Sequence, residues 1–149
     1  MEENVTIGKY VIWFAVINLA LTVCFSIALI LLEIDSNTSA VIASLVGAAM
    51  IAGSKFIQDH KRVPNRSDKT KLVWLSYLTS WLVSLLLLSG FILATSEGSQ
   101  LLGMVKSINM GIILGAIVFF SIVILATLSL SYGFLARKQL EDMKRKGVI

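Results

Sequence analysis

One short segment, residues 54–72, contains the rarest of the side chains in this chain that are suited to chemistry. Its sequence, SKFIQDHKRVPNRSDKTKL, contains the only histidine, His60, the only proline, Pro64, and six of the thirteen basic residues. A histidine among cations could belong to a hydrolase site, to a metal site or to a nucleic-acid surface. Each of these needs further residues, which the rest of the chain has to supply.

Enzymatic chemistry finds little support in the sequence. A Ser/His/acid hydrolase would need His60 beside an activated serine, and no nucleophile elbow surrounds any serine. With one His and one Cys, a single copy cannot assemble a zinc site from nitrogen and sulfur ligands. Phosphate-binding loops and nucleotide fingerprints are absent. We expect a non-enzymatic protein with no catalytic residue, cofactor or metal. Cys24 is expected to be a small buried side chain within the first apolar run.

The basic residues favour anionic lipid over nucleic acid. The basic loop at 58–71 has no interleaved Phe, Tyr or Trp for base stacking. Clusters of four to eight Lys or Arg beside a membrane span bind anionic headgroups, at about 1 kcal/mol per residue. We therefore expect contacts with anionic lipid headgroups or a protein partner, and none with nucleic acid. The predicted contact residues are Lys55, His60, Lys61, Arg62, Arg66, Lys69, Lys71, Arg137, Lys138, Lys144 and Arg145.

The composition indicates a membrane protein. Of the 149 residues, 56% are hydrophobic and 15% are charged, whereas soluble domains carry about 25% charge. Four apolar runs are each near the 20 or so residues that cross a bilayer as a helix. They cover about residues 10–32, 38–57, 72–95 and 107–136. We predict an all-α polytopic protein, a single four-helix transmembrane bundle over 1–149, with a basic loop at 58–71 and a tail at 137–149.

The placement of Lys and Arg predicts the topology. With four crossings both termini lie on the side of the 58–71 loop, and twelve of the thirteen basic residues then share that side. Basic residues accumulate in short cytoplasmic segments. The two opposite turns carry Glu33, Asp35 and Glu97. We expect a multi-pass protein of the bacterial inner membrane with cytoplasmic N- and C-termini.

Small residues predict where the helices pack. Close approach of small side chains is the main cue for helix contacts in lipid. The second run is the richest in them and is expected to be central, whereas the GxxxG of the fourth run could face this bundle or a second copy. The predicted packing residues are Ala43, Gly47, Ala48, Ala49 and Gly53, and then Ser107, Gly111 and Gly115.

Two stripes of neutral polar residues suggest a possible pathway through the membrane. They consist of Asn18, Thr22 and Ser26 in the first run, and Ser76, Ser80 and Ser84 in the third. The alternative is that the hydroxyls bond to carbonyls one turn earlier in their own helix. The chain resembles the small multidrug exporters in its four helices but lacks their acidic residue at mid-membrane, which binds the coupling ion.

Residues 48–88 carry a second resemblance. The segment has Lys55-Phe56, Arg62-Val63-Pro64 and Asp68-Lys69, followed by Trp81 and Ser84. It is similar to a family of small four-helix bacterial inner-membrane proteins, found in Acinetobacter and related Gammaproteobacteria. Asn65 stands where that family is expected to have Thr, and either residue can cap the next helix. The resemblance implies an inner-membrane protein and no reaction, cofactor or catalytic residue.

Two functional hypotheses remain. The first is an integral membrane accessory or interaction subunit, whose basic cytoplasmic surfaces meet anionic lipid or a partner. The second is a small transporter or channel, formed as a homo-oligomer, with neutral polar stripes along its path.

Overall fold

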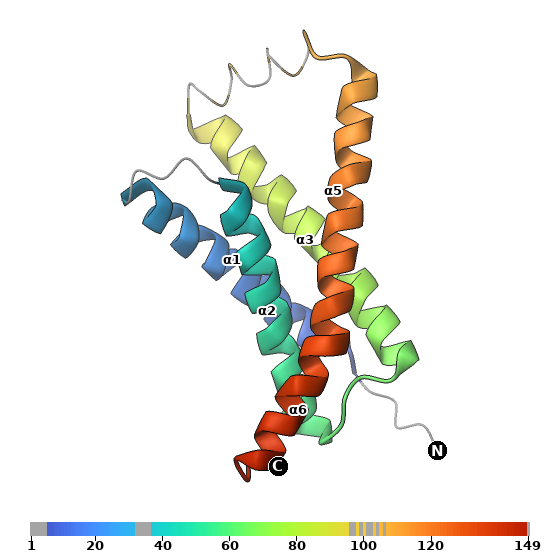
Figure 1. The fold of residues 1–149 in the computed structure, drawn as a ribbon. Coiled ribbons are helices and arrows are strands. Elements are labelled where there is room, and N and C mark those ends of the chain that lie inside the picture. Colours follow the sequence, from blue (N-terminus) through green and yellow to red (C-terminus); the bar gives the residue numbers. More distant parts are fainter. Residues whose placement is uncertain are drawn as a thin grey trace.

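The chain folds as four long helices. The computed structural model describes residues 6–31, 37–95 and 107–148, with the single positions 98, 100, 103 and 105. The helices are α1 (Gly8–Leu31), α2 (Asn37–His60), α3 (Arg66–Ala94) and α5 (Met110–Leu130), which continues through a π-helical turn, η1 (Ser131–Leu135), into α6 (Ala136–Arg145) (Figure 1). The spans at 8–29, 40–60, 66–94 and 110–145 are each long and apolar enough to cross a membrane. The all-α class and the four candidate spans are thereby confirmed. Glu33, Asp35 and Glu97 lie outside the described residues.

The helices meet at one end of the bundle and diverge towards the other. Figure 1 shows α1 beginning, α2 ending and α6 ending at the lower end, beside the 61–65 loop. The buried cluster lies at this end, which we call the packed end. Its residues are Ile7, Tyr10, Phe14, Leu45, Ala48, Ala49, Ala52, Phe56, Leu72, Val73, Leu128 and Tyr132. At the opposite, open end the side chains of α3 and α5 are mostly exposed.

Helix α2 is the central helix, as its small residues predict. Half of its apolar window is buried, compared with 11% for α1 and 6% for α3 and for the helix that runs from Met110 to Arg145. Ala48, Ala49 and Gly53 are buried. At Gly47 an added Cβ would lie 2.9 Å from Leu21 Cδ1 of α1, so a larger residue would displace the Leu21 side chain from this close approach.

Some residues with predicted packing roles are exposed instead. They are Ala43 on α2, Ser107, Gly111 and Gly115 near the start of the fourth span, and Cys24 on α1. An added Cβ on Gly115 would meet nothing within 4 Å. These residues lie towards the open end, where the helices diverge (Figure 1).

The loop between the second and third spans is shorter than the sequence suggests. Helix α2 continues to His60 and α3 starts at Arg66, not near Leu72. Asn65 is the N-cap, and its side chain accepts a hydrogen bond from the Asp68 N–H at 2.8 Å, as its resemblance to a cap predicts. Lys61 has a φ of 51°, the left-handed conformation that ends many helices. The first turn of α3 is charged, so hydropathy does not mark it as part of the span. It is helical because Asn65 caps it.

The fourth span also differs at its start. Helix α5 begins at Met110 rather than at Ser107, because the Asn109 side chain accepts a hydrogen bond from the Gly111 N–H at 2.8 Å. From there the helix is continuous through η1 and α6 to Arg145. The helix therefore continues beyond the apolar run, which is predicted to end at residue 136.

Candidate functional site

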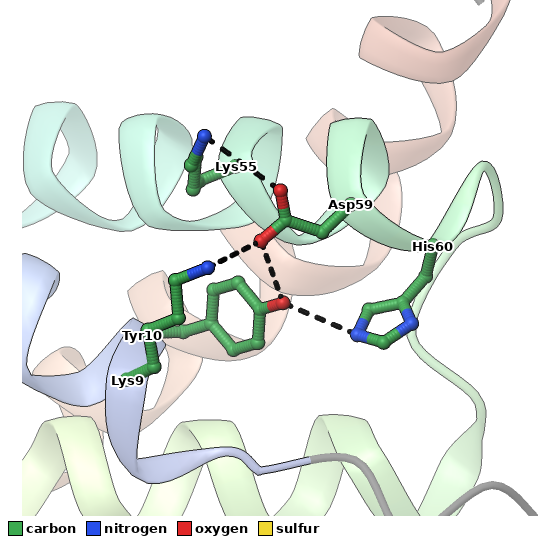
Figure 2. Close-up of polar contacts among 5 residues, drawn as sticks. All are labelled: Lys9, Tyr10, Lys55, Asp59 and His60. Atoms are coloured by element: carbon green, nitrogen blue, oxygen red, sulfur yellow. Dashed lines mark hydrogen bonds and ion pairs between the residues drawn. The ribbon is translucent and has the colours of Figure 1, made fainter.

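A cluster of polar side chains joins α1 to α2 at the packed end (Figure 2). Asp59 Oδ2 accepts hydrogen bonds from Lys9 Nζ and from the Tyr10 hydroxyl, each at 3.0 Å. Lys55 Nζ lies 3.6 Å from the other carboxylate oxygen of Asp59. The Tyr10 hydroxyl is also 3.1 Å from His60 Nε2. Asp59 is thus the acceptor around which the two helix ends are held together.

The donor assignments within this cluster restrict His60. The Tyr10 hydroxyl has a single hydrogen, which it donates to the Asp59 carboxylate. The hydroxyl oxygen therefore accepts from His60, so Nε2 of His60 carries a hydrogen. The ring also packs against Phe56, with centroids 4.8 Å apart. His60 is thus held in a structural contact through Nε2–H, and the lone pair of the neutral ring lies on Nδ1.

Arg62 is likewise engaged within the fold. Its Nη1 donates to Asp68 Oδ2 at 2.9 Å and to the Val63 carbonyl at 3.3 Å. Its guanidinium carbon lies 5.5 Å from the centre of the Phe56 ring. Asp68 is only 7% exposed, so this ion pair fixes the 61–65 loop to the first turn of α3. His60 and Arg62, predicted as lipid or partner contacts, thus both have partners inside the chain.

A second feature of the packed end is a basic pocket of about 310 Å³ between the 61–65 loop, α3, η1 and α6. Three cationic residues, Arg66, Lys69 and Arg137, line it together with Val63, Pro64, Asn65, Tyr132 and Gly133. No carboxylate of the described residues lines this pocket or pairs with these three cations. The pocket therefore presents uncompensated positive charge.

The π-helical turn shapes the floor of this pocket. Such turns interrupt the regular helical spacing and often occur at functional sites. Here the turn includes Tyr132, which is buried, and Gly133. A Cβ at Gly133 would lie 2.8 Å from Lys69 Nζ, so the missing side chain makes room for the ammonium group. The turn and the glycine together place Lys69 against the helix backbone.

No family model, curated protein or solved structure matches this chain. The chemistry of its own residues therefore has to indicate what the protein does.

The structure brings most of the two polar stripes together in one cavity. Asn18, Thr22 and Ser26 of α1 and Ser80 and Ser84 of α3 line a space of about 570 Å³. Because these residues line a space within a single chain, the cavity does not require a second copy. Ser76 is separate from the others and is fully buried, with its hydroxyl 2.9 Å from that of Tyr132.

The alternative interpretation of the hydroxyls also applies in part. Ser80 Oγ donates a hydrogen bond to the Tyr77 carbonyl, and Thr22 Oγ1 donates one to the Asn18 carbonyl, each at 2.8 Å. Both hydroxyls bond back along their own helix and still line the cavity. The two interpretations of the sequence are therefore compatible at these positions.

The remaining predicted contact residues lie on the surface of the packed end. Lys61, Lys71, Lys138 and Lys144 are exposed, as is Arg145, which pairs with Asp142 at 3.1 Å. Lys138 Nζ lies 4.9 Å from the centre of the Phe134 ring. These side chains add positive charge around the basic pocket without forming a second enclosed site.

Several residues of this end were missed by sequence reasoning. Asp59 has one local signal, its position four residues after Lys55 on the same helix, which is the spacing of a helical ion pair. Tyr10, Lys9 and Tyr132 have none, because their partners lie 49 to 56 positions away. Within the described ranges no three His, Cys, Asp or Glu side chains are placed to hold a metal ion.

Proposed function

We propose that the chain is a multi-pass protein of the bacterial inner membrane that works as a non-enzymatic accessory or interaction subunit and binds an anionic phospholipid headgroup in its basic pocket. The packed end then faces the cytoplasm, with both termini and the 61–65 loop. The support for this orientation is the positive charge of the sequence, because the side that holds Lys9, residues 54–71 and the tail has twelve of the thirteen basic residues.

The observation that carries the proposal is the uncompensated charge of the pocket. Arg66 and Lys69 of α3 and Arg137 of α6 converge on one space of about 310 Å³ that no carboxylate of the described residues lines. Basic pockets between membrane helices on the cytoplasmic side are typical headgroup sites, and hydrogen bonds to phosphate from charged donors are strong. A lipid phosphate would supply the missing negative charge while its acyl chains stay in the bilayer.

The resemblance to a family of inner-membrane proteins agrees with this site. Of the residues that carry the resemblance, Val63, Pro64 and Lys69 line the pocket, and Arg62 and Asp68 form the ion pair that fixes its loop. Lipid recognition would give this segment a role that needs no catalytic chemistry. We include membership of that family in the proposal.

The proposal can be tested by measuring which lipids remain with the purified protein. The full chain is extracted in mild detergent and its phospholipids are quantified by mass spectrometry. A triple variant, Arg66→Gln, Lys69→Gln and Arg137→Gln, is compared with a matched variant, Lys61→Gln, Lys71→Gln and Lys144→Gln, whose exposed cations lie outside the pocket. Loss of anionic lipid from the first variant only is expected. Failure of the wild-type protein to retain either anionic lipid or a protein partner would reject the proposal.

The second candidate function, a small transporter or channel, is favoured by one observation. The polar stripes of α1 and α3 line a common cavity, which contains no ionisable residue. Neutral polar groups can line a path without a titrating site. Flux of ions or amphipathic cations in proteoliposomes above that of protein-free vesicles would support this function, and its absence would reject it.

A further inference from the structure

The cavity between the polar stripes has two chemically different walls. One wall consists of the five polar residues of α1 and α3, Asn18, Thr22, Ser26, Ser80 and Ser84. The rest is apolar and comes from α2, α3 and α5, including Val41, Leu87 and Phe91. Its volume of about 570 Å³ is within the range of small-molecule sites. Ser84 is exposed, so the cavity is accessible from outside the bundle.

Asn18 supplies an independent indication that something is missing from this cavity. The residue is 5% exposed, and its Oδ1 is buried without a hydrogen-bond partner among the described residues. An unsatisfied buried acceptor costs about 1–3 kcal/mol, so such atoms are rare unless a ligand or water satisfies them. Asn18 lies in the wall of the cavity, but Oδ1 itself is enclosed, so a bound molecule supplies the donor once the amide turns about χ2.

The other fixed polar groups of the wall also offer acceptors. Ser80 uses its hydrogen on the Tyr77 carbonyl, and Thr22 uses its hydrogen on the Asn18 carbonyl and on Ser44 Oγ, which lies 3.0 Å away. A hydroxyl that has donated its hydrogen still has lone pairs to accept another. The matching ligand group is therefore a hydrogen-bond donor.

A neighbouring cavity provides space for an apolar body. It measures about 420 Å³ and shares Val41, Ser80, Ser84 and Ile124 with the first. Apart from the two serines and Trp81, its walls are aliphatic side chains of α2, of α5 and of Ile108 just before α5, together with Phe120. A molecule with a polar head and an apolar tail would match the two spaces in turn.

We propose that these adjoining cavities bind a neutral amphiphile whose head donates hydrogen bonds through a hydroxyl or amide group. The head contacts Asn18 and the hydroxyls of Thr22 and Ser80, and the tail lies towards Phe120 and Ile124. A charged head is disfavoured because no residue that lines either cavity is ionisable, and an unpaired charge at membrane depth is costly. The site is separate from the basic pocket and does not depend on the proposed function.

Photocrosslinking tests this inference. The full-length protein is reconstituted in phosphatidylcholine vesicles with hexadecanol that carries a diazirine near its hydroxyl. Matched probes replace the hydroxyl by a carboxylate or a trimethylammonium group. We expect the alcohol to label the 18–26 segment of α1 and the 80–91 segment of α3 more than the charged probes do. Equal labelling by the charged probes, or labelling spread evenly over the lipid-exposed helix faces, would overturn the proposal.

Two variants and a control complete the test. Asn18→Leu should reduce labelling about fivefold, the effect of one lost hydrogen bond, without lowering the thermal unfolding midpoint, because it removes an unsatisfied acceptor. Val41→Trp should reduce labelling by filling both cavities. Ser89→Leu is the control, since Ser89 is exposed on α3, bonds to the Leu85 carbonyl and lines neither cavity. Unchanged labelling of both Asn18→Leu and Val41→Trp would contradict the site even if all variants fold.

Discussion

The hydroxyls of Ser76 and Tyr132 lie 2.9 Å apart, although 56 residues separate them in the sequence. Both residues are buried, at 0% and 1% exposure, so this hydrogen bond joins α3 to the π-helical turn inside the core. It holds Tyr132 at the floor of the basic pocket. The packing of the core and the shape of the proposed headgroup site therefore depend on the same tyrosine.

A double-mutant cycle should measure this hydrogen bond. Ser76→Ala and Tyr132→Phe each remove one hydroxyl, and the double variant removes both. Hydrogen bonds between membrane helices contribute about 0.6 kcal/mol on average, so we expect a coupling energy of this size in the free energy of unfolding. Unfolding in mixed micelles with increasing denaturing detergent is a suitable measurement. Strictly additive effects would show that the two hydroxyls do not stabilise the fold through each other.

The cluster around Asp59 should show unequal contributions from its donors. Tyr10→Phe removes a hydroxyl of a residue that is 3% exposed, and we expect a loss of about 1 kcal/mol in the free energy of unfolding. Lys9→Met should cost about 0.5 kcal/mol or less, because the Lys9 side chain is 54% exposed and solvent weakens the ion pair. The same unfolding assay distinguishes them. A larger effect for Lys9→Met than for Tyr10→Phe would contradict the hydrogen-bond assignment.

The glycine at the pocket should separate binding from stability. In Gly133→Ala the new Cβ would lie 2.8 Å from Lys69 Nζ, so the ammonium group has to move, which its flexible side chain allows. We expect weaker retention of anionic lipid with little loss of stability, since alanine is a better helix former than glycine. Gly115→Ala is the control, because its Cβ would meet nothing within 4 Å. Equal lipid retention by both variants would show that the position of Lys69 does not matter.

The proposed orientation can be tested with single cysteines. Cys24 is exposed and would first be replaced by alanine. In intact cells a membrane-impermeant thiol reagent should label Ser99→Cys but not Ser67→Cys, because Ser67 lies in the first turn of α3 at the packed end. Labelling of Ser67→Cys alone from outside would reverse the topology and place the basic pocket on the other side of the membrane.

The sequence predicts the four spans well because length and hydropathy are local properties. It also predicts the central position of α2 from its small residues and the Asn65 cap from a three-residue spacing. The sequence predicts the start of α3 near Leu72, six residues late, because hydropathy marks where a helix becomes apolar and not where its hydrogen bonds begin.

The site was less predictable than the fold. The sequence identifies the basic residues of the pocket as contact residues. It does not show that they converge, because Gly133 and Lys69, which lie against each other, are more than sixty positions apart. The partners of His60 and Arg62 were not anticipated. Tyr10 is an ordinary apolar-run residue in the sequence, and only the packing of α1 on α2 places it against Phe56 and His60. Phe56 contacts His60 within α2 and Arg62 just beyond the end of α2.

The most direct test of the proposed function is a lipid titration of the wild-type protein and of the Arg66→Gln, Lys69→Gln, Arg137→Gln variant by native mass spectrometry. Each basic residue near an anionic headgroup contributes about 1 kcal/mol, so the wild-type protein should bind phosphatidylglycerol about tenfold or more tightly than phosphatidylcholine. The triple variant should lose this preference. A wild-type protein without the preference, or a triple variant that keeps it, would contradict the assignment of the pocket as a headgroup site.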